Sequence, residues 1–151
     1  MRAVLYIAQQ SGPQEKIGIS AIAEGLDIPK HYLAKLLQQL SGHDVVQSIK
    51  GPGGGFFLTE EARRQPLLRI IEVMDGPQVF KRCALGLAQC SNAHPCAIHR
   101  YVVPFRDAFY SAVRNTTIDQ LQREVDRGEA FITNLTQMTS SQPPSTTAEE
   151  E

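Results

Sequence analysis

The chain has 151 residues, 42% of them hydrophobic and 21% charged, which is the balance of a globular domain that buries a modest core. Its three cysteines are an odd number, its N-terminal residues become polar too soon for a secretory signal, and no apolar run reaches membrane-spanning length. These features argue against a secreted disulfide framework and a membrane protein, so we expect the protein to be cytoplasmic.

The net charge of −1 does not by itself indicate nucleic-acid binding. Residues 139–151, however, carry three of the sixteen acidic residues and no basic one, and they are rich in Ser, Thr and Pro. We expect this segment to be a disordered tail, because it lacks apolar periodicity. Without it, the chain holds fifteen Lys and Arg against thirteen Asp and Glu.

Three helices are predicted in the N-terminal part of the chain. The first covers residues 2–10, where apolar side chains recur with helical spacing. Ser20 is expected to cap a short second helix, and Pro29 to occupy the first position of a third. The third helix has an apolar stripe formed by Leu33, Leu36, Leu37 and Leu40. Its polar face and its start carry Lys30, His31, Lys35 and Gln38.

Two short strand-like runs follow the third helix, around residues 45–49 and 56–58. The sequence GPGGG between them indicates a hairpin turn, and it lacks the Lys-Ser/Thr that ends a phosphate-binding P-loop. The order of three helices and a hairpin predicts a winged helix-turn-helix, in a fold that is mainly α with a small β-hairpin wing. Small residues at a wing tip permit close approach to a DNA backbone, so the wing candidates for DNA contact are Lys50, Gly51, Gly53 and Gly54.

The charge balance of residues 1–58 is a constraint on this interpretation. Five basic residues stand against four acidic ones, and a polar helix face is often only a solvated surface. A single copy would therefore bind DNA weakly, and we expect a homodimer that doubles the phosphate contacts on a palindromic site.

The C-terminal half is predicted to be helical on either side of a cysteine-rich stretch. A connector helix within residues 59–82 begins at Pro66 and turns inward the side chains of Leu67, Ile70, Ile71 and Met74. Residues 100–138 continue an apolar helical stripe, interrupted by Pro104 and by Thr116 and Thr117, which are suited to cap a further helix. Such a long stripe needs either its own domain or a twin helix from a second subunit as partner, and we favour dimerisation helices.

All three cysteines fall between residues 83 and 99, together with a histidine at the end. The set Cys83, Cys90, Cys96 and His99 is compatible with an iron–sulfur cluster, and also with zinc, although the close C-x2-C pair of most zinc sites is absent. A reversible disulfide between Cys83 and Cys90 is a further alternative. If Pro95 opens the following helix, Cys96 and His99 lie on one face of its first turn, where the helix N-terminus favours a thiolate.

Five motifs, in this order, resemble the Rrf2 family of bacterial regulators, in particular its iron–sulfur branch of IscR and NsrR types: AVLYIAQ, YLAKLLQQL, KGPGGGFFL, IIEVMDGP, and CALGLAQC with PCAIH. The resemblance implies a homodimeric DNA-binding regulator, expected to be a repressor, whose cluster senses iron, nitric oxide or redox state. It implies that the three cysteines ligate the cluster, of [2Fe–2S] or [4Fe–4S] type, with His99 as fourth ligand in the IscR manner. The C-x6-C-x5-C spacing is one residue longer than in the IscR type, and few residues precede AVLYIAQ, so the acidic ligand of NsrR-type members is not expected here.

The resulting organisation is a DNA-binding domain at 1–58, a connector at 59–82, a cluster-binding loop at 83–99, dimerisation helices at 100–138 and a tail at 139–151. A protein-binding adaptor is an alternative from another class. An enzyme is the least expected, because no acid–base pair or nucleophile elbow is visible.

Overall fold

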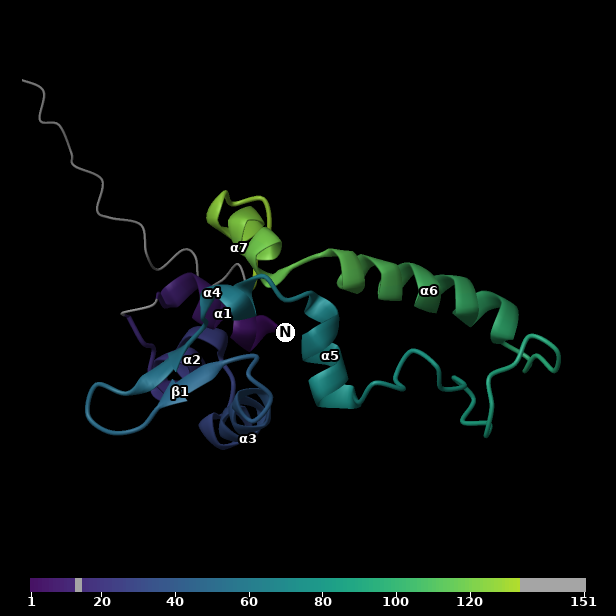
Figure 1. Cartoon of the computed structure of the whole chain (residues 1–151), viewed down its shortest axis with the longest axis horizontal. Helices are drawn as coiled ribbons and strands as arrows, with labels where there is room; N and C mark the ends of the chain where they lie inside the picture. The colour runs from purple at the N-terminus through teal and green to yellow at the C-terminus, as the bar shows by residue number, and fades with distance from the viewer. Residues whose placement is uncertain (13–14, 134–151) are drawn as a thin grey trace, which may run out of the picture.

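The computed structural model describes residues 1–12 and 15–133, and it is mainly helical with one antiparallel hairpin, as the sequence predicts (Figure 1). The elements in chain order are α1 (Arg2–Gln10), α2 (Ile19–Leu26), α3 (Lys30–Ser41), β1 (Gln47–Ile49), β2 (Gly55–Phe57), α4 (Glu60–Arg63), α5 (Leu67–Asp75), α6 (His99–Asn115) and α7 (Ile118–Asp126). The predicted tail at 139–151 and the end of the predicted dimerisation region lie outside the described residues. None of the described helices combines the length and the hydrophobicity needed to cross a bilayer.

The core forms where α1, α2 and α3 turn their apolar stripes toward one another. Ile7, Ile22, Leu33 and Leu37 are completely buried there. Ile118, at the start of α7, is completely buried in the same cluster. The N-terminal domain is therefore completed by a residue far beyond residue 58, and burial of these side chains is its main source of stability.

The beginnings of two helices differ from the sequence prediction. α2 begins at Ile19 after Gly18, so Ser20 is its second residue and not its cap. α3 begins at Lys30, and Pro29 is the residue just before the helix, where its fixed φ of −54° leads into the first turn. In both cases the chain enters the helix from an extended or turn conformation that needs no capping side chain.

The region between the hairpin and α5 contains a short helix that was not predicted. Thr59 caps α4 by accepting a hydrogen bond from the Ala62 N–H, at 3.2 Å. Arg63 then donates to the carbonyls of Ala8 and Ser11, at 2.8 and 2.7 Å. These carbonyls lie at the C-terminal end of α1, so α4 satisfies acceptors that a helix end leaves free.

The inner face of α5 also differs in part from the prediction. Leu67 and Ile70 are buried as expected, but Leu68 and Val73 are buried with them, whereas Ile71 and Met74 are only half-buried. The reason is that α5 packs against both α3 and α6, so its covered surface is wider than one stripe.

The hairpin pairs Gln47 with Phe57 and Ile49 with Gly55. Ile17 adds one bridge on the other side of β2, with N···O distances of 3.0 and 2.8 Å to Phe56. This bridge ties the wing to the segment that leads into α2.

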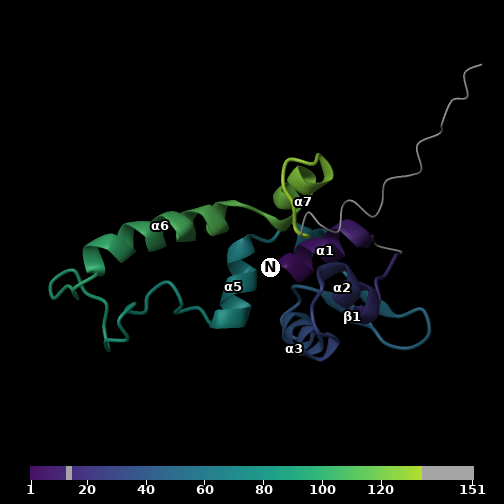
Figure 2. The same cartoon turned by 180° about the vertical axis from the view of Figure 1, so that it is seen from behind.

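The helix α6 is an arm that leaves the body of the protein, as Figures 1 and 2 show from both sides. It includes Pro104, as predicted, which costs the helix one backbone hydrogen bond. The base of the arm is fixed by two backbone hydrogen bonds, from Leu67 N–H to Thr116 O at 2.9 Å and from Ile118 N–H to Gln65 O at 3.1 Å. The arm therefore starts from a defined point beside α5.

Candidate nucleic-acid interface and metal site

The predicted DNA-contact residues of α3 are all on its outer surface. His31, Lys35 and Gln38 are exposed, at the end of the body opposite α7 (Figure 1). Lys30 is exposed too, but its Nζ donates a 2.8 Å hydrogen bond to Ser20 Oγ. Among the residues that the structure describes, none holds the side chain of His31, Lys35 or Gln38 in this way.

Gln39, which flanks this face, has a structural contact. Its side-chain amide donates to the Val73 carbonyl at 2.6 Å. Val73 lies in α5, so this hydrogen bond links the helix that carries the candidate DNA contacts to the helix that leads to the cysteines.

The wing tip has the backbone that its glycines suggest. Gly51 and Gly53 have φ values of 97° and 73°, a region that side chains other than glycine rarely adopt. A side chain at Gly54 would collide with the carbonyl of Ile49. Lys50 is exposed beside this turn. The wing therefore combines a positive charge with small residues that let a DNA backbone approach closely.

The cysteines lie on a segment without helix or strand that runs from α5 out along α6 (Figures 1 and 2). Pro95 does not open the next helix, so the condition considered from the sequence is not met. α6 begins at His99, and Cys96 precedes it in a turn closed by a 3.0 Å hydrogen bond from His99 N–H to Cys96 O. Cys96 therefore does not benefit from the first turn of the helix.

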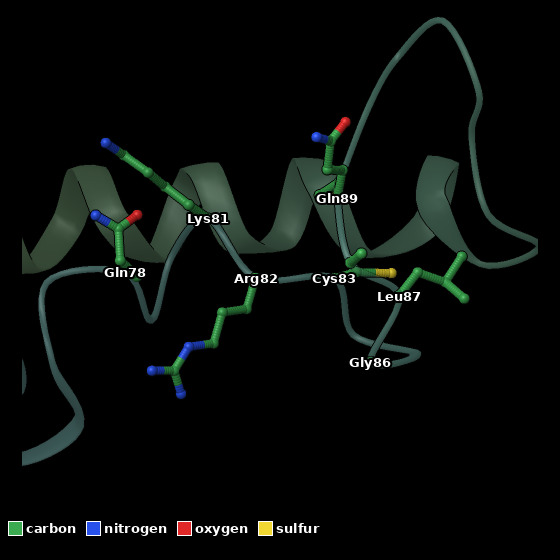
Figure 3. A pocket seen from close by; sticks show the side chains of 9 residues that line it. Gln78, Lys81, Arg82, Cys83, Gly86, Leu87 and Gln89 are labelled. Carbon is green, nitrogen blue, oxygen red and sulfur yellow. The ribbon is translucent and has the colours of Figure 1, made fainter.

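Cys83 is the most buried of the three thiols, at 8% exposure. The backbone N–H groups of Leu85 and Leu87 donate to its Sγ and lower the pKa of the thiol, with smaller contributions from Cys96 and from Gly86 N–H. Gly86 has a φ of 73° and bonds back to the Cys83 carbonyl at 2.9 Å, which curls the loop around the sulfur. Figure 3 shows the Cys83 sulfur directed toward Leu87, with Arg82 pointing away from it.

Cys90 and His99 form a second pair. The distance from Cys90 Sγ to His99 Nδ1 is 3.6 Å. The other ring nitrogen, Nε2, lies 2.6 Å from Asn92 Oδ1. Because an amide oxygen only accepts hydrogen bonds, Nε2 is the donor in this contact, and in the neutral ring Nδ1 then accepts from the Cys90 thiol.

Of the four predicted ligands, Cys90 and His99 are in contact, and Cys96 is near enough to Cys83 to contribute to the lowered pKa of that thiol. Among residues 1–12 and 15–133, no three side chains of the metal-binding types are close enough to hold one metal ion. The donor types nevertheless fit an iron–sulfur cluster, and the orientation of His99 is that of a metal ligand. A hollow of about 560 Å³ lies beside these residues (Figure 3). It is lined by Gln78, Lys81, Arg82, Cys83, Gly86, Leu87, Ala88, Gln89 and Cys90.

Two residues near this site were missed at the level of sequence. Asn92 resembles any loop asparagine, and nothing in its spacing indicates a contact with His99. Arg106 approaches Cys90 Sγ with its Nη1 at 3.4 Å, and this contact raises the pKa of the arginine. For Arg106 the sequence offered one signal. The residue is four positions from both Val102 and Tyr110, so in a helix it shares a face with these two side chains, which the structure shows to be half-buried.

Comparison with known proteins places the chain in a family. The model of Rrf2, described as iron-dependent transcriptional regulators, matches residues 1–124. IscR of Pectobacterium carotovorum subsp. carotovorum is 30% identical over 138 residues, which cover 86% of this chain and 82% of that protein. The repressor NsrR of Streptomyces coelicolor is 26% identical over 121 residues, which cover 80% of this chain and 81% of NsrR.

A solved structure supports the fold. CymR, the global cysteine regulator of B. subtilis, matches with a TM-score of 0.63 over 81% of this chain and 88% of its own, at 24% identity. The chain belongs to the Rrf2 family and is a DNA-binding transcriptional regulator, not an enzyme.

Proposed function

We propose that this regulator is a cytoplasmic homodimer whose operator binding is controlled by an iron–sulfur cluster on Cys83, Cys90, Cys96 and His99. The cluster senses iron, nitric oxide or redox state, and the regulator acts as a repressor. When bound, the cluster would supply an iron-based redox centre.

The ring of His99 is the observation that carries this proposal. Histidines that ligate metals typically donate their other ring N–H to an oxygen, which fixes the tautomer and the orientation of the ring. His99 does so with Asn92 Oδ1 at 2.6 Å, and its free nitrogen is directed to the sulfur of a second proposed ligand.

The separation of the donors into two pairs favours a cluster over a single ion. Zinc needs four donors around one point, whereas an iron–sulfur cluster has several irons and takes ligands on more than one of them. The pairs Cys83 with Cys96 and Cys90 with His99 suit the second requirement better.

The homodimer is supported by the outer face of α6. Tyr101, Phe105 and Phe109 are 64%, 72% and 45% exposed, and Ala108 and Ala112 on the same face are exposed as well. An aromatic face of this length on an arm indicates a partner surface. A two-fold dimer would present two copies of α3 and the wing to a palindromic operator, with contacts from Lys30, His31, Lys35, Gln38, Lys50, Gly51, Gly53 and Gly54.

The test starts from anaerobically purified protein and a pool of random duplex DNA. We expect selection to enrich a palindromic sequence, and we expect loaded and cluster-free protein to differ at least about fivefold in affinity for it, the lower range of allosteric coupling. Equal affinities for the two forms would contradict cluster control while leaving DNA binding intact.

A second candidate function is a thiol–disulfide switch, and one observation favours a particular pair. Cys96 contributes to the lowered pKa of the Cys83 thiol, and Cys90 lies beside His99, which favours a Cys83–Cys96 pair over the Cys83–Cys90 pair considered from sequence. Peptide mapping of peroxide-treated, metal-free protein would reveal a Cys83–Cys96 disulfide if this function holds, and operator affinity would then follow its formation.

A further inference from the structure

One arginine of α6 stands apart from the other charged side chains of the arm. Arg100, Asp107 and Arg114 are exposed, but Arg106 is half-buried on the inner face between Val102 and Tyr110. The Arg106 side chain is only 19% exposed. A largely buried guanidinium is costly unless its donors are satisfied, so its partners indicate its role.

The Nη1 atom of Arg106 reaches two points of the neighbouring loop. It lies 3.4 Å from Cys90 Sγ and 3.5 Å from the Arg82 carbonyl oxygen, the second contact being at the long limit of a hydrogen bond. Arg82 and Cys90 flank the loop that curls around the Cys83 sulfur. One nitrogen therefore holds both ends of this loop against α6.

The Nε donor of Arg106 lacks a hydrogen-bond acceptor among the described residues. Its Nε is buried and makes no hydrogen bond to any described residue. The Asp107 carboxylate is 3.6 Å from Nε, close enough for ionic attraction but too far for a hydrogen bond, and Asp107 itself is 67% exposed. A buried cation with a spare donor favours negative charge beside it, and the nearest proposed ligand is Cys90.

We propose that Arg106 is a positioning residue that closes the 82–90 loop onto α6 and gives the Cys90 sulfur a charged hydrogen-bond donor. The charge part of this proposal rests on the proposed function, because it requires Cys90 to be a thiolate ligand. The proposed closing of the loop does not rest on that function, because the contacts of Arg106 with the 82–90 loop are present without a cluster. Arginine suits both tasks, since its guanidinium is always charged and offers several donors in a fixed plane.

The first test measures the loop in reduced, metal-free protein by hydrogen–deuterium exchange. In wild type the amides of Leu85, Gly86 and Leu87 are bonded to the Cys83 sulfur or carbonyl. We expect Arg106→Met to raise exchange in peptides covering 82–90 several-fold, with unchanged exchange in α1 and α3. Arg106→Lys keeps the positive charge but replaces the planar guanidinium with a single ammonium group, so it should restore only part of the protection from exchange.

Arg114→Met is the matched control, because Arg114 is an exposed arginine of the same helix and contacts Tyr110 instead of the loop. Unchanged exchange over 82–90 in Arg106→Met, or equal changes in Arg106→Met and Arg114→Met, would overturn the closing role. Faster exchange throughout the protein would also overturn it, since it would reveal a general loss of stability.

The second test uses protein that carries the cluster. A hydrogen bond from a cation to a ligand sulfur favours the reduced, more negative state, so Arg106→Met should lower the midpoint potential relative to wild type and Arg114→Met. An unchanged potential would overturn the charge role. If wild type binds no cluster, the proposed function fails, and the exchange experiment still decides the closing role by itself.

Discussion

The imidazole of His99 contacts one proposed ligand and one loop residue: Nδ1 lies 3.6 Å from Cys90 Sγ, and Nε2 lies 2.6 Å from Asn92 Oδ1. Asn92 fixes the proton on Nε2, and the lone pair of Nδ1 is left for a ligand. We expect His99→Ala to shorten the lifetime of the cluster and to change its absorption spectrum. Asn92→Ala should have a milder effect, on the order of a 10- to 100-fold loss of affinity, as for other residues that orient a metal ligand.

His94→Ala is the matched control for these variants. His94 is an exposed histidine of the same segment, without a hydrogen bond to another described side chain, and its replacement should leave the cluster unchanged. Cluster lifetimes in air, followed by absorbance, would compare the three variants. A wild-type spectrum and lifetime in His99→Ala would show that this histidine is not a ligand.

The charged residues of the proposed DNA-contact surface allow a prediction about salt. Lys35 and Lys50 are exposed on α3 and on the wing, respectively. Replacing either by alanine should weaken binding to any DNA and reduce the slope of log affinity against log salt by about one, because one phosphate contact is lost. Titrations at several salt concentrations would measure the slope.

Lys81→Ala serves as the control for the same titrations, since Lys81 is an exposed lysine beside the cysteines and away from α3. If Lys35→Ala and Lys50→Ala keep the wild-type slope, the docking of α3 and the wing proposed above is incorrect.

At the scale of whole elements, the start of α7 is marked in the sequence by a threonine that caps the helix. Thr117 accepts a hydrogen bond from Gln120 N–H at 3.2 Å, and Gln120 Oε1 accepts one from Thr117 N–H at 2.8 Å. This reciprocal capping box fixes the start of α7, whose Ile118 is completely buried. Loss of such a cap typically costs about 1 kcal/mol.

Thr117→Ala should accordingly lower the melting temperature by about 2–4 °C, the shift expected for roughly 1 kcal/mol in a chain of this size. Thr116→Ala is the control, because the Thr116 side chain does not cap the helix. The hydrogen bonds of its backbone, from Leu67 N–H to its carbonyl and from its N–H to Ala112 O, survive the substitution. Thermal unfolding followed by circular dichroism would separate the two, and equal shifts would contradict the cap assignment.

The helices of the N-terminal half were predictable because each buries a regular apolar stripe, and Leu33 and Leu37 are completely buried as their spacing requires. The glycines of the wing were equally informative. The short helix α4 could have been found as well, since Thr59 is followed by two glutamates, an ordinary helix start.

The cysteine site was predictable in composition but not in geometry. No capping residue marks the beginning of α6, and the helix starts at His99 because the preceding turn closes on Cys96 O. The partners of Cys83 are backbone N–H groups, which all residues except proline carry, so no pattern of side chains reveals them. The pairing of the four donors depends on how the loop folds along α6.

At the scale of the whole molecule, the exposed face of the α6 arm is the feature that most requires a partner. Phe105 is 72% exposed at its centre. We expect Phe105→Asp to dissociate the proposed dimer, because a charge would have to be buried between apolar surfaces. Sedimentation at several protein concentrations would give the mass of the particle.

Ser111→Asp places the same charge on a solvent-facing position of the same helix that lies away from the aromatic face, and it should leave the mass unchanged. A monomeric wild type, or a Phe105→Asp variant of unchanged mass, would exclude this face as the dimer interface.

The proposed iron–sulfur cluster is tested most directly by the metal and sulfide content of protein that is purified without oxygen. The measurement is an absorption spectrum together with analysis of iron, sulfide and zinc, on wild type and on a variant with Cys83, Cys90 and Cys96 all replaced by alanine. We expect a coloured wild-type protein with iron and sulfide in comparable amounts, and a colourless variant with neither. A colourless wild type that contains zinc and no iron would contradict the cluster assignment.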